Sequence, residues 1–199
     1  MKILIIGGNG TIGSKVTAEL KKRHQVIVAG RKSGDVTVDL SSEGSIEKMF
    51  REIPNLDAVI SIAGATKWGD FEELTEEDFY ISIRNKLMGQ VNLVRIGQRY
   101  LKDNGSFTLT TGILGDDPVK GSVGASMVNG GIHSFVIAAS RELKRGLRIN
   151  VVAPGLVEDA AERQGHLFPG HIPVSMKRAV SGYVRSVEGN VTGEVIKLY

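Results

Sequence analysis

The sequence contains no cysteine. This absence excludes disulfide bonds, a cysteine nucleophile and thiolate metal ligands. A long apolar run is also missing at the start, where Met1 and Lys2 precede only four aliphatic residues and then glycines. Such a stretch is too short for the apolar region of a signal peptide. We therefore expect a cytoplasmic protein that needs no oxidising compartment.

A large excess of charge of one sign is lacking as well. The 25 Lys and Arg residues nearly balance the 22 Asp and Glu residues, which leaves a net charge of +3. An excess this small predicts no nucleic-acid partner.

One segment, residues 121–140, has no charged side chain and is about as long as a membrane span. Its glycines and serines, together with Asn129 and His133, lower its hydropathy. Its aliphatic residues recur at helical spacing. We expect no membrane segment, but a helix that is covered by a sheet and by a second subunit.

Short β-branched runs alternate with helical patterns along the whole chain. Strands are expected at residues 2–6, 25–29, 36–38, 58–62, 107–111, 149–153 and 194–197. Helices are expected at residues 12–22, 45–51, 75–100, 124–144 and 174–186. This alternation predicts an α/β fold: a Rossmann-type, doubly wound parallel sheet of about seven strands with helices on both faces.

The chain has no repeats and no linker rich in Pro, Gly or Ser, so residues 1–199 are expected to form a single domain. Thr75, followed by three carboxylates, is a favourable helix start, and Asp103-Asn104-Gly105 is expected to end the same helix. Residues 114–123 are expected to form a loop at the carboxyl end of a central strand. Ligands bind at that end of open α/β sheets.

The strongest motif lies between the first strand and the first helix and reads Gly7-Gly8-Asn9-Gly10-Thr11-Ile12-Gly13. In such a loop Gly7 permits a sharp turn, Gly10 lets a pyrophosphate approach the backbone, and Gly13 lets the helix pack on the strand. The free N–H groups at the helix start favour an anion. The motif predicts a dinucleotide-binding domain; the alternative is a tight turn without a ligand.

The second expected strand is followed by Gly30-Arg31-Lys32. An acidic residue at this place would hydrogen-bond the ribose hydroxyls of NAD. The Arg31 guanidinium, with Lys32 beside it, instead suits a 2′-phosphate. We therefore expect NADP (NADPH) to be preferred over NAD; the alternative is that both side chains form a solvated turn.

With these features in place, the chain resembles the short-chain dehydrogenase/reductase family along nearly its full length. Further stretches that resemble the family are Asp39-Leu40, Ser61-Ile62-Ala63-Gly64, Pro154-Gly155 and Thr192-Gly193. The resemblance implies contacts of Asp39, Leu40, Ala63 and Gly64 with the cofactor, and of Pro154 and Gly155 with its nicotinamide end. It also implies a homodimer or homotetramer that assembles through helices 75–100 and 124–144.

The family's catalytic side chains are a Ser, a Tyr and a Lys four residues after the Tyr. By the same resemblance, these places fall on Gly112, Ala125 and Asn129, so all three side chains are missing. None of the four tyrosines precedes a lysine by four residues. A fourth catalytic place, an Asn, falls on Lys86 or on the adjacent Asn85, because this stretch can be registered in two ways.

If this register holds, Lys86, Thr110, Thr111, Ser126 and Asn129 line the nicotinamide end. Lys86 is the only ionisable group among them, and burial would lower its pKa so that it could act as an acid. Lys86, Thr111 and Asn129 are the candidate catalytic residues. The alternatives are that Lys86 binds the cofactor ribose or loop carbonyls and that the threonines pack. The four histidines show no metal-ligand spacing, and His133 is expected to be a hydrogen-bonded core residue.

Two functions follow from these residues. The first is an oxidoreductase that transfers hydride between NADP(H) and a small carbonyl or hydroxyl compound. The second is a catalytically weak or inactive NADP(H)-binding sensor or scaffold, which the missing Tyr and Lys favour. An isomerase or a nucleotide-sugar enzyme on the same fold ranks last, because it would also need the Tyr and Lys pair.

Overall fold

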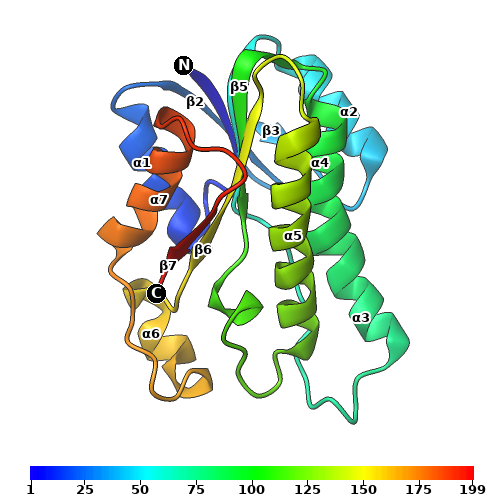
Figure 1. Ribbon diagram of the computed structural model, residues 1–199, viewed down its shortest axis with the longest axis vertical. Helices are drawn as coiled ribbons and strands as arrows, with labels where there is room; N and C mark the ends of the chain where they lie inside the picture. Colours follow the sequence, from blue (N-terminus) through cyan, green and yellow to red (C-terminus); the bar gives the residue numbers. More distant parts are fainter.

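The computed structural model describes all 199 residues. Seven parallel strands form one sheet in the order β3-β2-β1-β4-β5-β6-β7 (Figure 1). The strands are β1 (Lys2–Ile6), β2 (Gln25–Gly30), β3 (Val36–Thr37), β4 (Leu56–Ser61), β5 (Leu101–Thr110), β6 (Arg148–Pro154) and β7 (Val195–Leu198). The expected seven-stranded Rossmann-type α/β fold is confirmed, with every strand displaced by at most a few residues except β5.

Helices cover both faces of the sheet (Figure 1). One face carries α1 (Thr11–Lys21) and α7 (Met176–Glu188), which pack on Ile3, Ile5 and Ile60. The other face carries α2 (Glu43–Glu52), α4 (Gly89–Gly97) and α5 (Val123–Glu142), which pack on Leu4, Val59 and Phe107. Both faces of the central strands are buried, and this explains their nearly continuous apolar sequences.

The strand order reverses beside β1, which pairs with β2 on one side and with β4 on the other. The connections that leave β1 and β4 therefore run to opposite sides of the sheet. This arrangement leaves a crevice at the carboxyl ends of the two strands, the usual ligand site of doubly wound folds. In Figure 1 these ends point to the lower edge, where α6 (Glu158–Gln164) also lies.

The prediction of a single helix over residues 75–100 is wrong, because the segment is interrupted in its interior and ends earlier than expected. It is divided into α3 (Glu76–Ser82), a π-helix η1 (Ile83–Met88) and α4, which ends at Gly97. Asp103-Asn104-Gly105 does not end this helix, because it lies inside β5. Asn104 has a positive φ of 61°, and the register of β5 against β4 shifts here. The turn residues therefore form an irregularity within a strand.

Three short helices were not expected from the sequence. They are α6 and the 3-10 helices η2 (Ile113–Gly115) and η3 (Gly165–Leu167), all in the connections at the ligand end of the sheet. Each is too short to show a clear apolar periodicity. No helix combines the length and apolar character that a membrane crossing requires.

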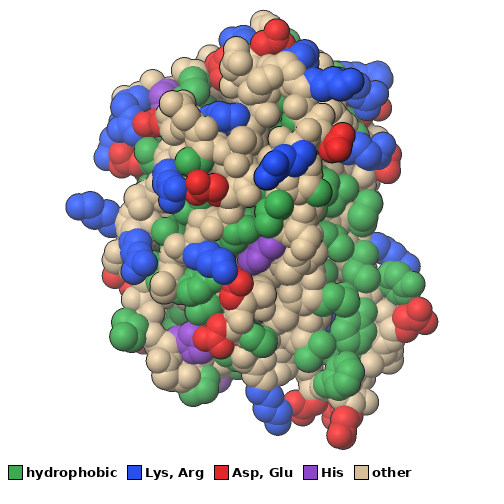
Figure 2. Space-filling view, viewed as in Figure 1, with side chains coloured by type: hydrophobic (Ala, Val, Ile, Leu, Met, Phe, Trp, Pro, Cys, Tyr) green, Lys and Arg blue, Asp and Glu red, His purple; other side chains and the backbone are tan.

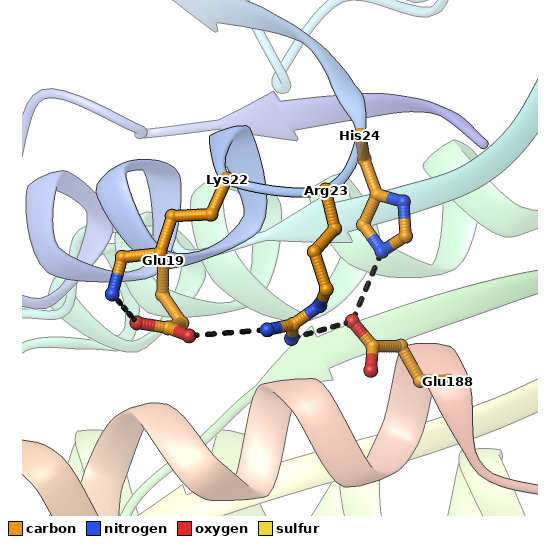
Figure 3. A network of polar contacts seen from close by, with 5 residues as sticks. All are labelled: Glu19, Lys22, Arg23, His24 and Glu188. Carbon is orange, nitrogen blue, oxygen red and sulfur yellow. Dashed lines mark hydrogen bonds and ion pairs between the residues drawn. The ribbon is translucent and has the colours of Figure 1, made fainter.

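The opposite end of the molecule is held by an ion-pair network between α1 and α7 (Figure 3). Arg23 bridges two carboxylates, Glu19 at 3.4 Å and Glu188 at 2.9 Å. His24 lies 3.0 Å from the same Glu188 oxygen, and Lys22 pairs with Glu19. The network joins the ends of two helices on one face of the sheet, far from the crevice.

Candidate functional site

The glycine motif forms the turn from β1 into α1. Gly7 has a φ of 81°, and a Cβ there would lie 2.6 Å from the Ile62 carbonyl oxygen. A Cβ on Gly13 would lie only 2.0 Å from the Gly7 carbonyl oxygen, so a side chain is excluded there. Gly10 is different: it is exposed, and its Cβ would meet only Gly7 O, at 3.3 Å. Because Gly10 is the N-cap of α1, its bare backbone leaves the N–H groups of the helix accessible.

The other residues of the motif take different places. Thr11 is exposed in the first turn of α1, and Ile12 points toward the ends of the strands, where it lines a cavity. Asn9 is exposed and donates a 3.2 Å hydrogen bond to Ser33 Oγ, which ties the glycine turn to the loop after β2.

On one side of this turn lies a cavity of about 370 Å³, here named the adenine-side cavity. Its walls come from β1, the loops after β2, β3 and β4, and η1. The lining residues are Ile6, Gly7, Gly30, Arg31, Val38, Leu40, Ala63, Gly64, Ala65 and Asn85. Five of the residues expected to bind cofactor, Gly7, Arg31, Leu40, Ala63 and Gly64, are brought together here.

Arg31 is the cation of the adenine-side cavity. Its guanidinium lies 3.5 Å from Asp39 Oδ1 and 3.4 Å from Asn85 Oδ1, and about 62% of its side chain is exposed. Two long contacts hold it weakly, so it remains free to bind an incoming anion.

Asp39 and Lys32 do not line the adenine-side cavity. The hydroxyl and N–H of Ser41 hydrogen-bond the Asp39 carboxylate and, with the nearby Arg31, hold its pKa below the ordinary value. Lys32 is exposed in the turn after β2.

A second cavity of about 230 Å³, the strand-end cavity, lies on the other side of the turn. Its walls come from the start of α1, the loop after β4, the π-helix η1, the loop after β5, α5 and the segment after β6. Polar atoms enter it from Lys86, Thr111, Asn129, Thr66 and Gln164. The remaining lining residues are Ile12, Trp68, Gly112, Ile113, Leu114, Ala125, Pro154, Gly155, Leu156, Val157, Ala160 and Phe168. The three candidate catalytic residues therefore meet in one place.

The stretch that can be registered in two ways, residues 84–89, lies in the π-helix η1 and the first residue of α4. A π-helix has more residues per turn than an α-helix, and such segments are frequent at functional sites. Here η1 places Asn85 on the adenine-side cavity and its neighbour Lys86 on the strand-end cavity. Both residues therefore face the crevice. The lysine stem packs against bare backbone, since a Cβ on Gly64 would lie 2.8 Å from Lys86 Cγ.

Lys86 has no carboxylate partner. Burial alone lowers its pKa from 10.5 to about 8. Lys86 is only partly exposed, and an ammonium removed from most of its water without a counter-ion is costly unless something else binds it. Near neutral pH this group still carries its proton, and it is a stronger acid than an ordinary lysine.

Asn129 is the complementary group. Its side chain is 2% exposed, and its Oδ1 is buried without a hydrogen-bond partner. An unpaired buried acceptor is unusual in a folded protein. Together with the free ammonium of Lys86, it gives the strand-end cavity one unused acceptor and one unused cation.

Thr111 is joined to His133 by a hydrogen bond of 2.8 Å between Oγ1 and Nε2. His133 is nearly buried, so the expected hydrogen-bonded core histidine is confirmed.

Two other expectations about this cavity are wrong, since Thr110 and Ser126 do not line it. Thr110 Oγ1 donates to the Ser61 carbonyl, and Ser126 hydrogen-bonds Ser122.

Two aromatic residues form part of the wall of the strand-end cavity. Trp68 and Phe168 meet edge to face with ring centroids 6.4 Å apart. Phe168 in turn packs on His171, whose Nε2 lies 3.1 Å from Asp117 Oδ2. The segment after β6 is thereby fastened to the loop after β5. The family resemblance places the segment around Phe168 over the substrate, but no periodicity in the sequence singles out Phe168 itself.

The sequence also matches a known family over most of its length. The family model described as enoyl-(acyl carrier protein) reductase matches residues 5–188. The chain belongs to the short-chain dehydrogenase/reductase family. The resemblance inferred from the motifs is confirmed, and the family is one of oxidoreductases.

Two curated relatives support this membership. A 3-oxoacyl-(acyl-carrier-protein) reductase FabG of Aquifex aeolicus is 28% identical over 167 residues, which are 78% of this chain and 64% of the relative. Carbonyl reductase family member 4 of Xenopus tropicalis is 27% identical over 177 residues, 77% of this chain and 74% of the relative. The chain thus spans less than two thirds of the FabG relative.

Solved structures agree over the whole chain. The protein lin1944 from Listeria innocua is 43% identical, covers all of both chains and superposes with a TM-score of 0.98. A small-chain dehydrogenase in complex with NADPH is 26% identical, covers 100% of this chain and 96% of its own, and gives a TM-score of 0.86.

The residues present fit a dinucleotide. The bare backbone at Gly10 can receive a pyrophosphate, and the two cavities on either side of the turn can receive the two ends of the molecule. Arg31 stands at one end, and the unpaired groups of Lys86 and Asn129 at the other. A nicotinamide dinucleotide therefore agrees with both the shape and the donor set.

Proposed function

We propose that the protein binds NADP(H) and acts as an oxidoreductase on a small carbonyl or hydroxyl compound, with Lys86 as the proton donor. The observation that carries the proposal is the unpaired ammonium of Lys86, whose pKa is lowered to about 8, in the strand-end cavity. By family resemblance, the places of the usual Ser, Tyr and Lys are taken by Gly112, Ala125 and Asn129, so the proton must come from another group.

In the proposed reaction, four residues of the strand-end cavity have distinct roles. When bound, NADPH supplies the hydride. Reduction of a carbonyl builds negative charge on its oxygen, and the ammonium of Lys86 stabilises that charge and transfers a proton from Nζ. The Asn129 side chain forms part of the wall against which the ligand lies, and Trp68 and Phe168 limit the entry of water.

Steady-state NADPH oxidation with a panel of small ketones, diketones and quinones tests the activity. We expect slow but measurable turnover on at least one of them, because general acid catalysis by a single group contributes about 10²–10⁴-fold. Tight NADPH binding without oxidation of any of these compounds would favour the sensor or scaffold function instead.

Cofactor selectivity is expected to depend on Arg31. NADPH should bind more tightly than NADH, and Arg31→Ala should weaken NADPH binding by about tenfold or more while NADH binding stays the same, because one charge-assisted phosphate contact is worth about 1.5–3 kcal/mol. Calorimetric titration of both cofactors measures this. Equal affinities of the unmodified protein for NADPH and NADH would contradict the proposal.

We also propose that the protein is a homodimer or homotetramer. Apolar side chains remain exposed along η1 and α5, among them Met88, Val123, Met127 and Ile137, and Figure 2 shows hydrophobic side chains gathered on this side. Such a surface is typical of a subunit interface. We expect light scattering to report an oligomer at micromolar concentration and Ile137→Glu with Met127→Glu to dissociate it. A monomeric unmodified protein would refute the assignment.

A further inference from the structure

We infer that His133 is a positioning residue: it donates a hydrogen bond to Thr111 and thereby aims the Thr111 hydroxyl proton at the substrate oxygen. The inference rests on the proposed oxidoreductase function and adds a second hydrogen-bond donor to it. Neither residue corresponds to the Ser, Tyr and Lys that the family resemblance implies.

The geometry of the pair supports this role. Thr111 lines the strand-end cavity and is 7% exposed, and its hydroxyl hydrogen-bonds only one protein group, the Nε2 of His133 at 2.8 Å. A hydroxyl has one proton to donate and two lone pairs to accept with. If Nε2 carries the proton and donates, the hydroxyl proton remains free. It can then point into the cavity, toward a developing negative charge.

The surroundings of His133 permit the required tautomer. A carboxylate bonded to Nδ1 would hold the proton on the wrong nitrogen. The carboxylate that acts electrostatically on the ring, Asp116, is instead engaged on both oxygens, by Lys197 Nζ at 2.8 Å and by the Tyr199 hydroxyl. Nothing in the chain therefore fixes the proton on Nδ1.

The charges around the ring favour a neutral imidazole. Burial is the main cause that lowers the pKa of His133, and Lys197 and Lys86 lower it further, while Asp116 opposes them. A neutral ring has one N–H, and its hydrogen bond to Thr111 decides the direction in which the hydroxyl points.

The ring is also fixed in place by its neighbours. A Cβ on Gly115 would lie 2.7 Å from His133 Cε1 and 3.3 Å from Asn129 Cβ, so the loop after β5 closes directly on both side chains. Asn129 and His133 are four residues apart on α5 and share one face of that helix. The same face thus presents the unpaired Asn129 oxygen and, through Thr111, a donor.

The first experiment reads the tautomer without any turnover. The ¹⁵N chemical shifts of His133 in the intact protein at pH 7 to 8 should show the proton on Nε2, and comparison with His133→Gln assigns the signals. A ring protonated on Nδ1, with Nε2 as acceptor, would mean that the Thr111 hydroxyl donates its hydrogen bond to the histidine and has no proton left for the substrate. That result would overturn the inference whether or not the protein oxidises NADPH.

The second experiment measures kcat for NADPH oxidation with diacetyl or phenanthrenequinone. Thr111→Val should lower kcat by about 10²-fold, as expected for loss of one donor to a developing oxyanion, while the dissociation constant of NADPH stays unchanged. His133→Leu should have a similar effect. The double variant should be no worse than Thr111→Val alone, because His133 acts through Thr111.

Conservative variants separate positioning from packing. Thr111→Ser keeps the hydroxyl and His133→Gln keeps an N–H donor, so both should recover most of the lost kcat. His24→Gln, at the other end of the molecule, is the matched control and should leave kcat unchanged. Additive losses in the double variant, or a His133→Leu protein with lower thermal stability but full kcat, would show that His133 only packs. A wild-type protein without turnover would instead refute the proposed activity and leave the tautomer result to decide this inference.

Discussion

Lys86→Met is expected to lower kcat for NADPH-dependent carbonyl reduction by about 10²–10⁴-fold, the usual contribution of a general acid. Methionine keeps the unbranched apolar stem of the lysine at nearly the same length but can neither donate a proton nor stabilise an oxyanion. The stem packs on Gly64, and no carboxylate depends on the ammonium. The fold and the NADPH affinity should therefore change little, and the loss should appear in kcat measured at saturating NADPH.

The matched control is Lys144→Met, which removes an exposed lysine beyond the end of α5. It should leave kcat unchanged. Equal activity of Lys86→Met and the unmodified protein would show that another group supplies the proton. A loss of NADPH binding in Lys86→Met, with kcat preserved, would instead assign Lys86 to the cofactor ribose.

The same lysine sets a pH dependence with two opposite signs. Its active form carries the proton, so kcat should be highest below pH 8 and fall as the pH rises through the pKa of about 8. The free energy of unfolding, in contrast, should rise with pH. Between about pH 8 and 10.5 the lysine still holds its proton in the unfolded chain but has lost it in the folded protein. Over this range its contribution to the free energy of unfolding should rise by about 3 kcal/mol. Lys86→Met should lose both dependences, and denaturant unfolding at several pH values measures the second.

Gly13→Ala is expected to abolish NADPH binding and to destabilise the fold. The new Cβ would lie 2.0 Å from the Gly7 carbonyl oxygen, so the turn between β1 and α1 must open. Overpacking of this kind typically costs about 1–3 kcal/mol, and here it acts on backbone that cannot rotate away. Thermal unfolding and calorimetric titration with NADPH measure the two effects.

Gly10→Ala separates cofactor binding from folding at the same turn. Its Cβ would lie 3.3 Å from one backbone oxygen only, so stability should change little. The methyl group would nevertheless stand before the N–H groups that receive the pyrophosphate, and NADPH affinity should fall at least about tenfold. Gly165→Ala, where a Cβ meets nothing within 4 Å, is the control for both variants. Unchanged NADPH affinity in Gly10→Ala would place the pyrophosphate elsewhere.

The strands were predictable because burial on both faces leaves a strong sequence signal. The runs at Ile3–Ile6 and Ile149–Ala153 are apolar with one exception, begin after a basic residue and end before glycine or proline. The break within the expected helix 75–100 was not predictable in the same way. A π-helix adds one residue to a turn and shifts the apolar pattern only slightly over so short a segment, so periodicity does not readily distinguish it from a continuous helix.

The candidate site was predictable in its parts but not in its contacts. Lys86, Thr111 and Asn129 were chosen from a motif register, and the structure brings all three to the strand-end cavity. Periodicity indicated that His133 is buried. Its contact with Thr111 depends on how the loop after β5 folds back on α5. No local sequence pattern predicts the course of that loop. The same holds for Gln90, which is fully buried and exchanges two hydrogen bonds with the backbone of Thr110.

The π-helix has a consequence for how the two ends of the site communicate. Arg31 touches Asn85, and the next residue along the chain is Lys86. A phosphate that draws Arg31 away from the Asn85 side chain would therefore change a contact one residue away from the proposed proton donor. By thermodynamic reciprocity, any influence of that phosphate on the proton affinity of Lys86 must be matched by an equal influence of pH on phosphate affinity. In the proposed scheme we therefore expect cofactor choice and proton supply to be linked, so that the affinity for NADPH depends on pH across the pKa of Lys86.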